Sequence, residues 1–177
     1  DNKEKEMGMY PGGNVIRITP TISATAYSVG DVLFLTTEIP NAVSNRGGVS
    51  RLIGVTMVSQ HDATDDVGLV FMENSKDLIG ALSPGSSGGP AITDANVEAA
   101  NILGYTLLDS STNEIDLGGS HVYTTNSKGN AAAYPHPFLL KAAEGSTSVY
   151  VAGIAVDAQD YGAVDDLDLI FHVEYIG

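Results

Sequence analysis

Two groups of acidic residues have the side chains most capable of chemistry in this sequence. The first is a short segment with one histidine and three aspartates: His61, Asp62, Asp65 and Asp66. The second surrounds another segment: Asp157, Asp160, Asp165, Asp166 and Asp168. Calcium takes six to eight oxygen ligands, but neither group has the spacing of a helix–loop–helix calcium site. Aspartates also form turns and keep loops hydrated. We therefore favour solvated loops and keep calcium as the alternative.

A loop rich in glycine and serine could supply a nucleophile. Its sequence, Gly85-Ser86-Ser87-Gly88-Gly89-Pro90, resembles the nucleophile loop of trypsin-like serine proteases, with Ser86 where that family has an acidic residue. Such a serine needs a histidine base and an orienting carboxylate. His61 and Asp65 precede Ser87 in the right order, but too closely to leave room for the first barrel of that fold. We interpret the segment as a flexible loop and reject the protease hypothesis.

The remaining candidates for chemistry are weak. None of the four histidines has a partner at metal-ligand spacing, so no zinc site is expected: His61, His121, His136 and His172. The absence of cysteine excludes disulfides and thiolate ligands, and the absence of tryptophan argues against sugar binding. Paired carboxylates for glycoside hydrolysis remain a minor alternative. We predict no catalytic residue, no cofactor and no metal site.

The charge of the chain limits its partners. There are 22 acidic and 8 basic residues among 177, which gives a formal net charge of −14. Such a surface repels phosphate backbones and anionic lipids, so we expect neither nucleic-acid nor membrane binding. The few arginines, among them Arg17 and Arg51 in predicted strands, are expected to form local ion pairs or interface anchors.

The elements that must position these residues are mostly strands. Residues 167–175 alternate apolar and polar side chains, which is the pattern of a strand with one buried face. Similar runs of β-branched and aromatic residues predict strands at 15–19, 32–36, 52–58, 67–72, 103–108, 121–125, 138–141 and 149–156. In 52–58 the pattern groups Ile53, Val55 and Met57 on one face. Residues 141–150 predict a hairpin with its turn at Glu144-Gly145-Ser146.

One short segment predicts a helix, at residues 94–102, with Thr93 or Asp94 as N-cap and Gly104 close after its end. Residues 1–13 predict a flexible N-terminal arm that ends in a Pro11-Gly12-Gly13 turn. Many strands with one minor helix predict an all-β fold. We expect residues 14–177 to form one antiparallel, jelly-roll-like β-sandwich domain.

Several segments together resemble small virion structural proteins of tailed phages. The resemblance begins at residues 16–21, 26–34 and 37–43. It continues through residues 99–104, 116–120, 140–152 and the closing strand. It covers 15–176 in order, leaves out the N-terminal arm and departs from the family at 131–137.

The resemblance implies a non-enzymatic protein that decorates the exterior of a phage capsid and stabilises it. The implied partners are the major capsid protein and copies of the chain itself, with a trimer as one option. We expect deletion of the arm to weaken attachment and leave the fold intact. The main alternative is a tail, collar or receptor-binding module of the virion. A carboxylate-based hydrolase and a carbohydrate-binding module are weaker ones.

Overall fold

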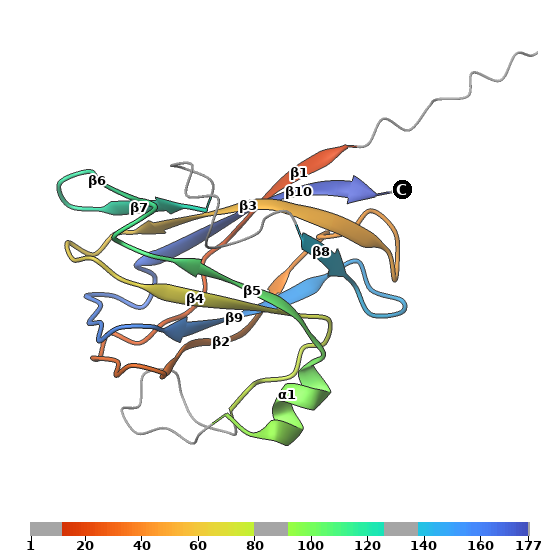
Figure 1. Ribbon diagram of the computed structural model, residues 1–177, viewed down its shortest axis with the longest axis horizontal. Helices are drawn as coiled ribbons and strands as arrows, with labels where there is room; N and C mark the ends of the chain where they lie inside the picture. Colours follow the sequence, from red (N-terminus) through yellow and green to blue (C-terminus); the bar gives the residue numbers. More distant parts are fainter. Residues whose placement is uncertain (1–11, 80–91, 126–137, 177) are drawn as a thin grey trace, which may run out of the picture.

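The computed structural model describes residues 12–79, 92–125 and 138–176, which form two packed antiparallel sheets with one short helix (Figure 1). The larger sheet has the order β1 (Gly13–Ile18), β10 (Leu167–Ile176), β3 (Val49–Ser59), β7 (His121–Thr124) and β6 (Glu114–Asp116), and β8 (Phe138–Lys141) also pairs with β3. The smaller sheet has the order β2 (Val32–Ile39), β9 (Val149–Ala155), β4 (Val67–Met72) and β5 (Ile102–Leu108). The predicted all-β sandwich with one short helix is confirmed.

The C-terminal strand β10 occupies a central place in the larger sheet, between β1 and β3. Its odd-numbered residues from Leu167 to Val173 are buried, whereas Asp168, His172 and Glu174 remain partly exposed. The alternation therefore places the apolar side chains between the two sheets and the polar ones on the outer face. The sequence pattern predicted this orientation correctly.

A bulge in β3 changes the phase that the sequence pattern indicated. Opposite β10, Gly54 pairs with His172 and Leu52 pairs with Val173, so Ile53 is an extra residue on β3. An extra residue reverses the alternation beyond it. As a result Leu52 is buried beside Val55, and Ile53 is 43% exposed. The predicted grouping of Ile53 with Val55 and Met57 is wrong for this reason.

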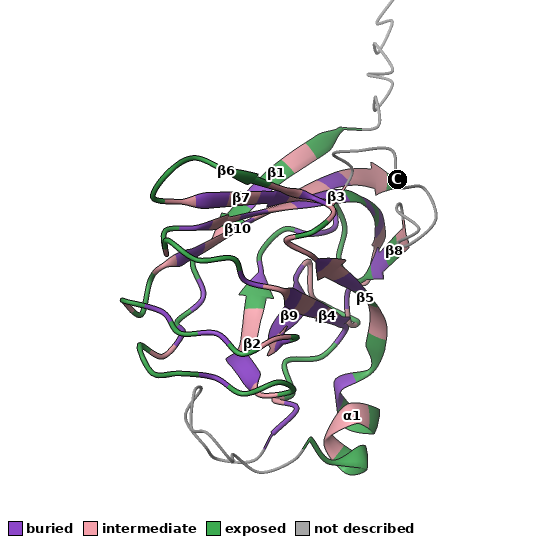
Figure 2. Ribbon diagram, turned by 60° about the vertical axis from the view of Figure 1, so that its left-hand side comes forward, coloured by how far each residue is buried: buried purple, intermediate pink, exposed green. Residues whose placement is uncertain are grey.

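Aromatic rings fill the space between the sheets. The ring of Phe71 in β4 packs edge-on against Phe171 in β10, with ring centroids 5.9 Å apart. Phe34 in β2 is fully buried over Gly153 of β9, where any Cβ atom would lie 2.2 Å from a ring carbon. Figure 2 shows buried residues along the strands of both layers. Truncating one of these phenylalanines to alanine would cost about 3–5 kcal/mol.

The predicted hairpin at 141–150 is wrong. The turn itself is present, since Gly145 has a φ of 82° and the Ser146 N–H donates to the Ala143 carbonyl (3.0 Å). However, β8 pairs with β3 in the larger sheet, whereas β9 pairs with β2 and β4 in the smaller one. The turn therefore carries the chain from one layer to the other.

The helix α1 (Asp94–Ala100) begins as predicted and ends early. The Thr93 side chain caps it by accepting a hydrogen bond from the Asn96 N–H. Its C-cap is Asn101, which has the left-handed conformation (φ 52°). The chain enters β5 at Ile102, so Gly104 is a strand residue and not the residue that ends the helix.

The predicted arm meets the sheet at its last two residues. Gly13 is the first residue of β1, and the Gly12 carbonyl accepts a hydrogen bond from the Tyr175 N–H (2.9 Å). Residues 1–11 lie outside the described residues. Across the described ranges, no helix has the length and apolar character that a membrane crossing requires.

Candidate functional site

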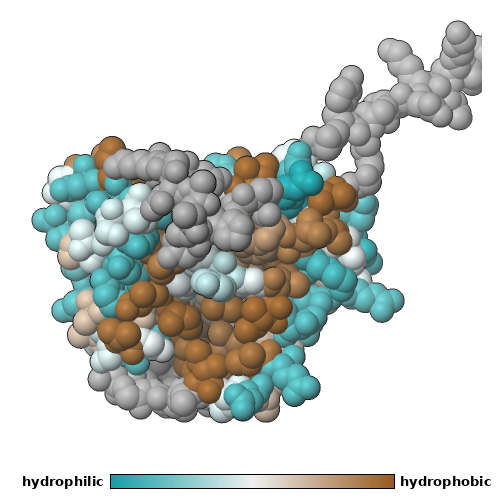
Figure 3. All heavy atoms as spheres, in the orientation of Figure 1, coloured by the Kyte–Doolittle hydropathy of each residue, from teal (hydrophilic) through white to brown (hydrophobic). Residues whose placement is uncertain are grey.

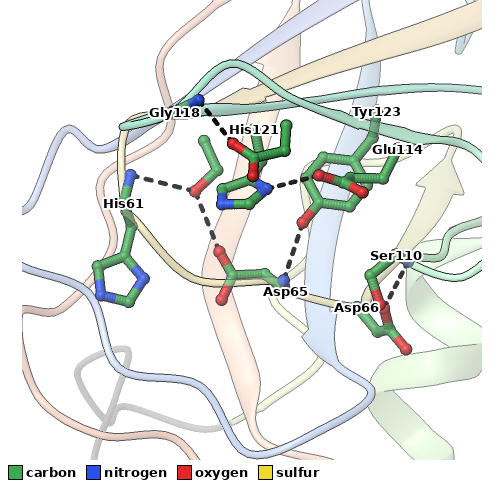
Figure 4. Close-up of polar contacts among 10 residues, drawn as sticks. His61, Asp65, Asp66, Ser110, Glu114, Gly118, His121 and Tyr123 are labelled. Carbon is green, nitrogen blue, oxygen red and sulfur yellow. Dashed lines mark hydrogen bonds and ion pairs between the residues drawn. The ribbon is translucent and has the colours of Figure 1, made fainter.

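The fold brings the two acidic groups of the sequence together at one end of the sandwich. The Asp66 N–H donates to Asp157 Oδ1 (3.1 Å), and the Gln60 N–H donates to the Asp166 carbonyl (2.8 Å). The loop between β3 and β4 therefore lies against the segment that joins β9 to β10. The β6–β7 hairpin adds His121 and Tyr123 to the same region (Figure 4).

Asp65 is the most perturbed carboxyl group among the described residues. It is 1% exposed, and its Oδ2 accepts a hydrogen bond from Ser59 Oγ (3.0 Å). Its backbone N–H donates to the Tyr123 hydroxyl (2.9 Å) (Figure 4). Burial raises the pKa of Asp65 to about 6, because the interior disfavours the charged form. The Ser59 hydrogen bond and the nearby His61 oppose this rise, and Asp157 adds to it.

Ser59 is not arranged as a nucleophile. Its hydroxyl donates to Asp65, and it accepts only the backbone N–H of His61 (3.4 Å). The His61 ring instead lies beside Tyr161, with ring centroids 5.7 Å apart. Its Nδ1 atom is buried and has no hydrogen-bond partner in the described part of the chain. A serine nucleophile needs an adjacent general base to accept its proton, and the His61 imidazole lies against Tyr161 and not beside this hydroxyl.

His121 forms a buried pair with Glu114. Its Nδ1 lies 2.6 Å from Glu114 Oε1, and the two side chains are only 7% and 14% exposed. The hydrogen bond to Glu114 is the main cause that raises the pKa of His121, and burial opposes it. Folding therefore favours the charged form of His121 more than the unfolded chain does. Glu114 lies in β6, a three-residue strand that the sequence pattern did not predict.

A second set of polar groups extends the network to the neighbouring loop. The Tyr161 hydroxyl donates to Gln159 Oε1 (2.6 Å), and Gln159 Nε2 donates to Asp157 Oδ1 (2.7 Å) and to the Asp66 carbonyl. Tyr27 packs edge-on against Tyr161. Burial raises the pKa of both tyrosine hydroxyls, so they stay protonated. Sequence analysis missed Gln159 and Tyr161, because only the fold places them beside the acidic loops.

The arrangement as a whole fastens loops to one another. Asp65 and Gln159 are buried, and Asp66 accepts the Ser110 N–H (2.7 Å), so these groups are occupied by protein partners. Within the described residues, no group of three or more histidine, aspartate or glutamate side chains could hold a metal ion. The glycine-serine loop with Ser87, and His136, lie outside the described residues.

The arginines of the strands form ion pairs, as predicted. Arg17 Nη1 lies 2.8 Å from Asp168 Oδ2, and Arg51 Nη1 lies 2.6 Å from Glu174 Oε2. Both pairs lie across neighbouring strands on the outer face of the larger sheet. Exposed pairs of this kind contribute about 0–1 kcal/mol each. They link neighbouring strands of the larger sheet.

Comparison with known proteins does not assign the chain to a class. No protein-family model matches it, and no curated protein matches it.

Proposed function

We propose that this protein is a non-enzymatic structural protein that binds to the exterior of a phage capsid and stabilises it. The observation that carries the proposal is the state of Asp65. This carboxyl group has the raised pKa that a general acid would need, yet it is 1% exposed and bonded to Ser59. A substrate cannot reach it. The carboxyl group with the raised pKa thus supports the fold, which suits a protein that acts through its surface.

Two further features support the proposal. The sequence resembles small virion structural proteins of tailed phages over residues 15–176. The sandwich also has a fully buried aromatic core and paired strands, so it can act as a rigid body. A rigid protein that binds only the assembled shell stabilises that shell by mass action. Its partners would be the major capsid protein and further copies of the chain itself.

The test is to locate the chain in purified particles. Particles assembled with and without the gene are banded on a density gradient, and their protein content and cryo-electron density are compared. We expect the chain in many copies on the outer capsid surface, and we expect particles without it to release DNA at a lower temperature. Density on a tail or collar would favour the alternative virion role, and absence from the particles would refute a virion role.

A further inference from the structure

The two sheets differ in what their outer faces present to solvent. In the larger sheet the outer face alternates in the usual way and carries Arg51, Asp168, His172 and Glu174. In the smaller sheet, β4, β5 and β9 contain no charged residue at all. An antiparallel sheet with one hydrated face is normally polar on that face. The smaller sheet departs from this rule in a chain that has 17% charged residues.

The register of the smaller sheet identifies the residues on its outer face. Val70 pairs with Ala152 on one side and with Tyr105 on the other, and Gly68 pairs with Ile154 and Leu107. Val156 also lies on this face, because it is 3.5 Å from the position of a Cβ atom on Gly68. We call the following residues the apolar face: Gly68, Val70, Tyr105, Leu107, Ile154 and Val156.

The helix covers only one end of this sheet. Met72, Ala100 and Ala152 form a small buried cluster with Leu78, and Val97 packs against it. Beyond that cluster Tyr105 is 70% exposed and Val156 is 40% exposed. Figure 3 shows apolar side chains gathered over the middle of the face in view, where Figure 1 places β4, β5 and β9. An exposed apolar surface of this kind marks an interaction site.

The border of the apolar face is acidic. Asp66 precedes β4, Asp109 follows β5 and Asp157 lies just after β9, so three aspartates stand at the end of the sheet away from α1. At the other end α1 itself carries Asp94 and Glu98. A second copy of the chain would bring these like charges together. A partner whose apolar centre is bordered by lysine and arginine would bring opposite charges together.

We propose that the apolar face is the docking surface for a heterologous protein with an uncharged apolar centre and a basic border. This inference rests on the proposed function, because it takes the capsid shell as the partner. Tyr105 lies in the edge strand β5 and is 70% exposed, and its aromatic ring is the anchor, as tyrosines often are in protein interfaces.

The test uses capsids of the phage that encodes this chain, assembled without it, and measures attachment of the purified protein by co-sedimentation. Tyr105→Asp places a charge on the most exposed residue of the face, and we expect at least about tenfold weaker attachment. Val156→Asp is the second variant on the same face. The matched control is Val15→Asp, at a residue that is 62% exposed on the larger sheet, where we expect a change below about twofold. Thermal melting of each variant checks that it folds.

The outcomes separate the two proposals. If the unmodified protein fails to attach, the capsid role and this docking surface are both refuted. If it attaches and both face variants attach equally well, only the docking surface is refuted. Attachment should weaken as sodium chloride rises from about 0.05 to about 0.5 M, because salt screens opposite charges. Self-association that Tyr105→Asp abolishes would show that the occupant is a second copy, and would overturn the inference.

Discussion

Replacing Asp65 by asparagine should remove much of the pH dependence of folding stability between about pH 4 and pH 7. In the unfolded chain this carboxyl group has the ordinary pKa of 3.8, and burial raises it to about 6 in the folded protein. The folded state therefore holds the proton more tightly. Protonated Asp65 favours folding; this contribution is complete below the unfolded pKa and is lost as the pH rises through about 6.

The size of the effect follows from the shift. Each pKa unit corresponds to about 1.4 kcal/mol, so the free energy of unfolding should fall by about 3 kcal/mol across this range on account of Asp65. An asparagine amide can still accept the hydrogen bond from Ser59, but a buried N–H without an acceptor costs about 1–3 kcal/mol. The net gain at neutral pH is consequently small, and the flattened pH profile is the decisive result. The pKa of His121 is also raised in the folded protein. Its protonated form therefore stabilises the fold, and this contribution is lost as the pH rises through the folded pKa of His121, so the variant keeps some decrease of stability with pH.

The assay is urea unfolding at a series of pH values, followed by tyrosine fluorescence, since the chain has eight tyrosines and no tryptophan. The matched control is Asp160→Asn, at an exposed residue of the neighbouring acidic segment, which should keep the wild-type slope. A wild-type slope in the Asp65→Asn variant would refute the reasoning. So would a carboxyl carbon of Asp65 that titrates near 3.8 in a nuclear magnetic resonance experiment.

Two further predictions test the packing and the buried ion pair. Gly153→Ala should destabilise the fold by at least about 1–3 kcal/mol, because its Cβ would overlap the ring of Phe34, whereas Gly119→Ala, whose Cβ meets nothing within 4 Å, should leave the melting temperature almost unchanged. Equal melting temperatures would contradict the packing. Glu114→Gln should lower the pKa of His121, as measured by imidazole proton shifts, and an unchanged pKa would show that the carboxylate is not the cause.

The strands could be predicted from the sequence because burial on one face imposes a period of two. Residues 167–175 carry that period with Ile170 as the one apolar residue on the polar side, and the structure places them as expected. The bulge at Ile53 could not be predicted from the pattern of β3, because it appears only when β3 is paired with β10. The failed hairpin at 141–150 has a related cause. A tight turn specifies a change of direction, but the partners of β8 and β9 lie far away in the sequence.

The polar network at the end of the sandwich could be predicted only in part. The acidic loops were evident as clusters, and the turn-forming role of aspartate agrees with the hydrogen bond from the Ala163 N–H to Asp166 (2.7 Å). The expectation of solvated loops is wrong for Asp65, which is 1% exposed, because Ser59 and Tyr123 replace its contacts with water. The partners of Asp65 and His121 were not evident. Tyr123 and Glu114 reach them from the β6–β7 hairpin, and β6 is too short to show a periodic pattern.

The apolar face illustrates a limit of a different kind. A strand with apolar side chains on both faces has one face in the core. Its other face can be covered by another element of the same chain or by another protein. The sequence of β4 is the same in both cases. The packing in the structure distinguishes the two cases. The Met72 side chain of β4 lies in the buried cluster at α1, whereas Tyr105 of the neighbouring strand β5 is 70% exposed. Among the described residues, the part of the sheet beyond the helix is therefore apolar without being buried, and that combination is the reason for proposing it as a docking surface.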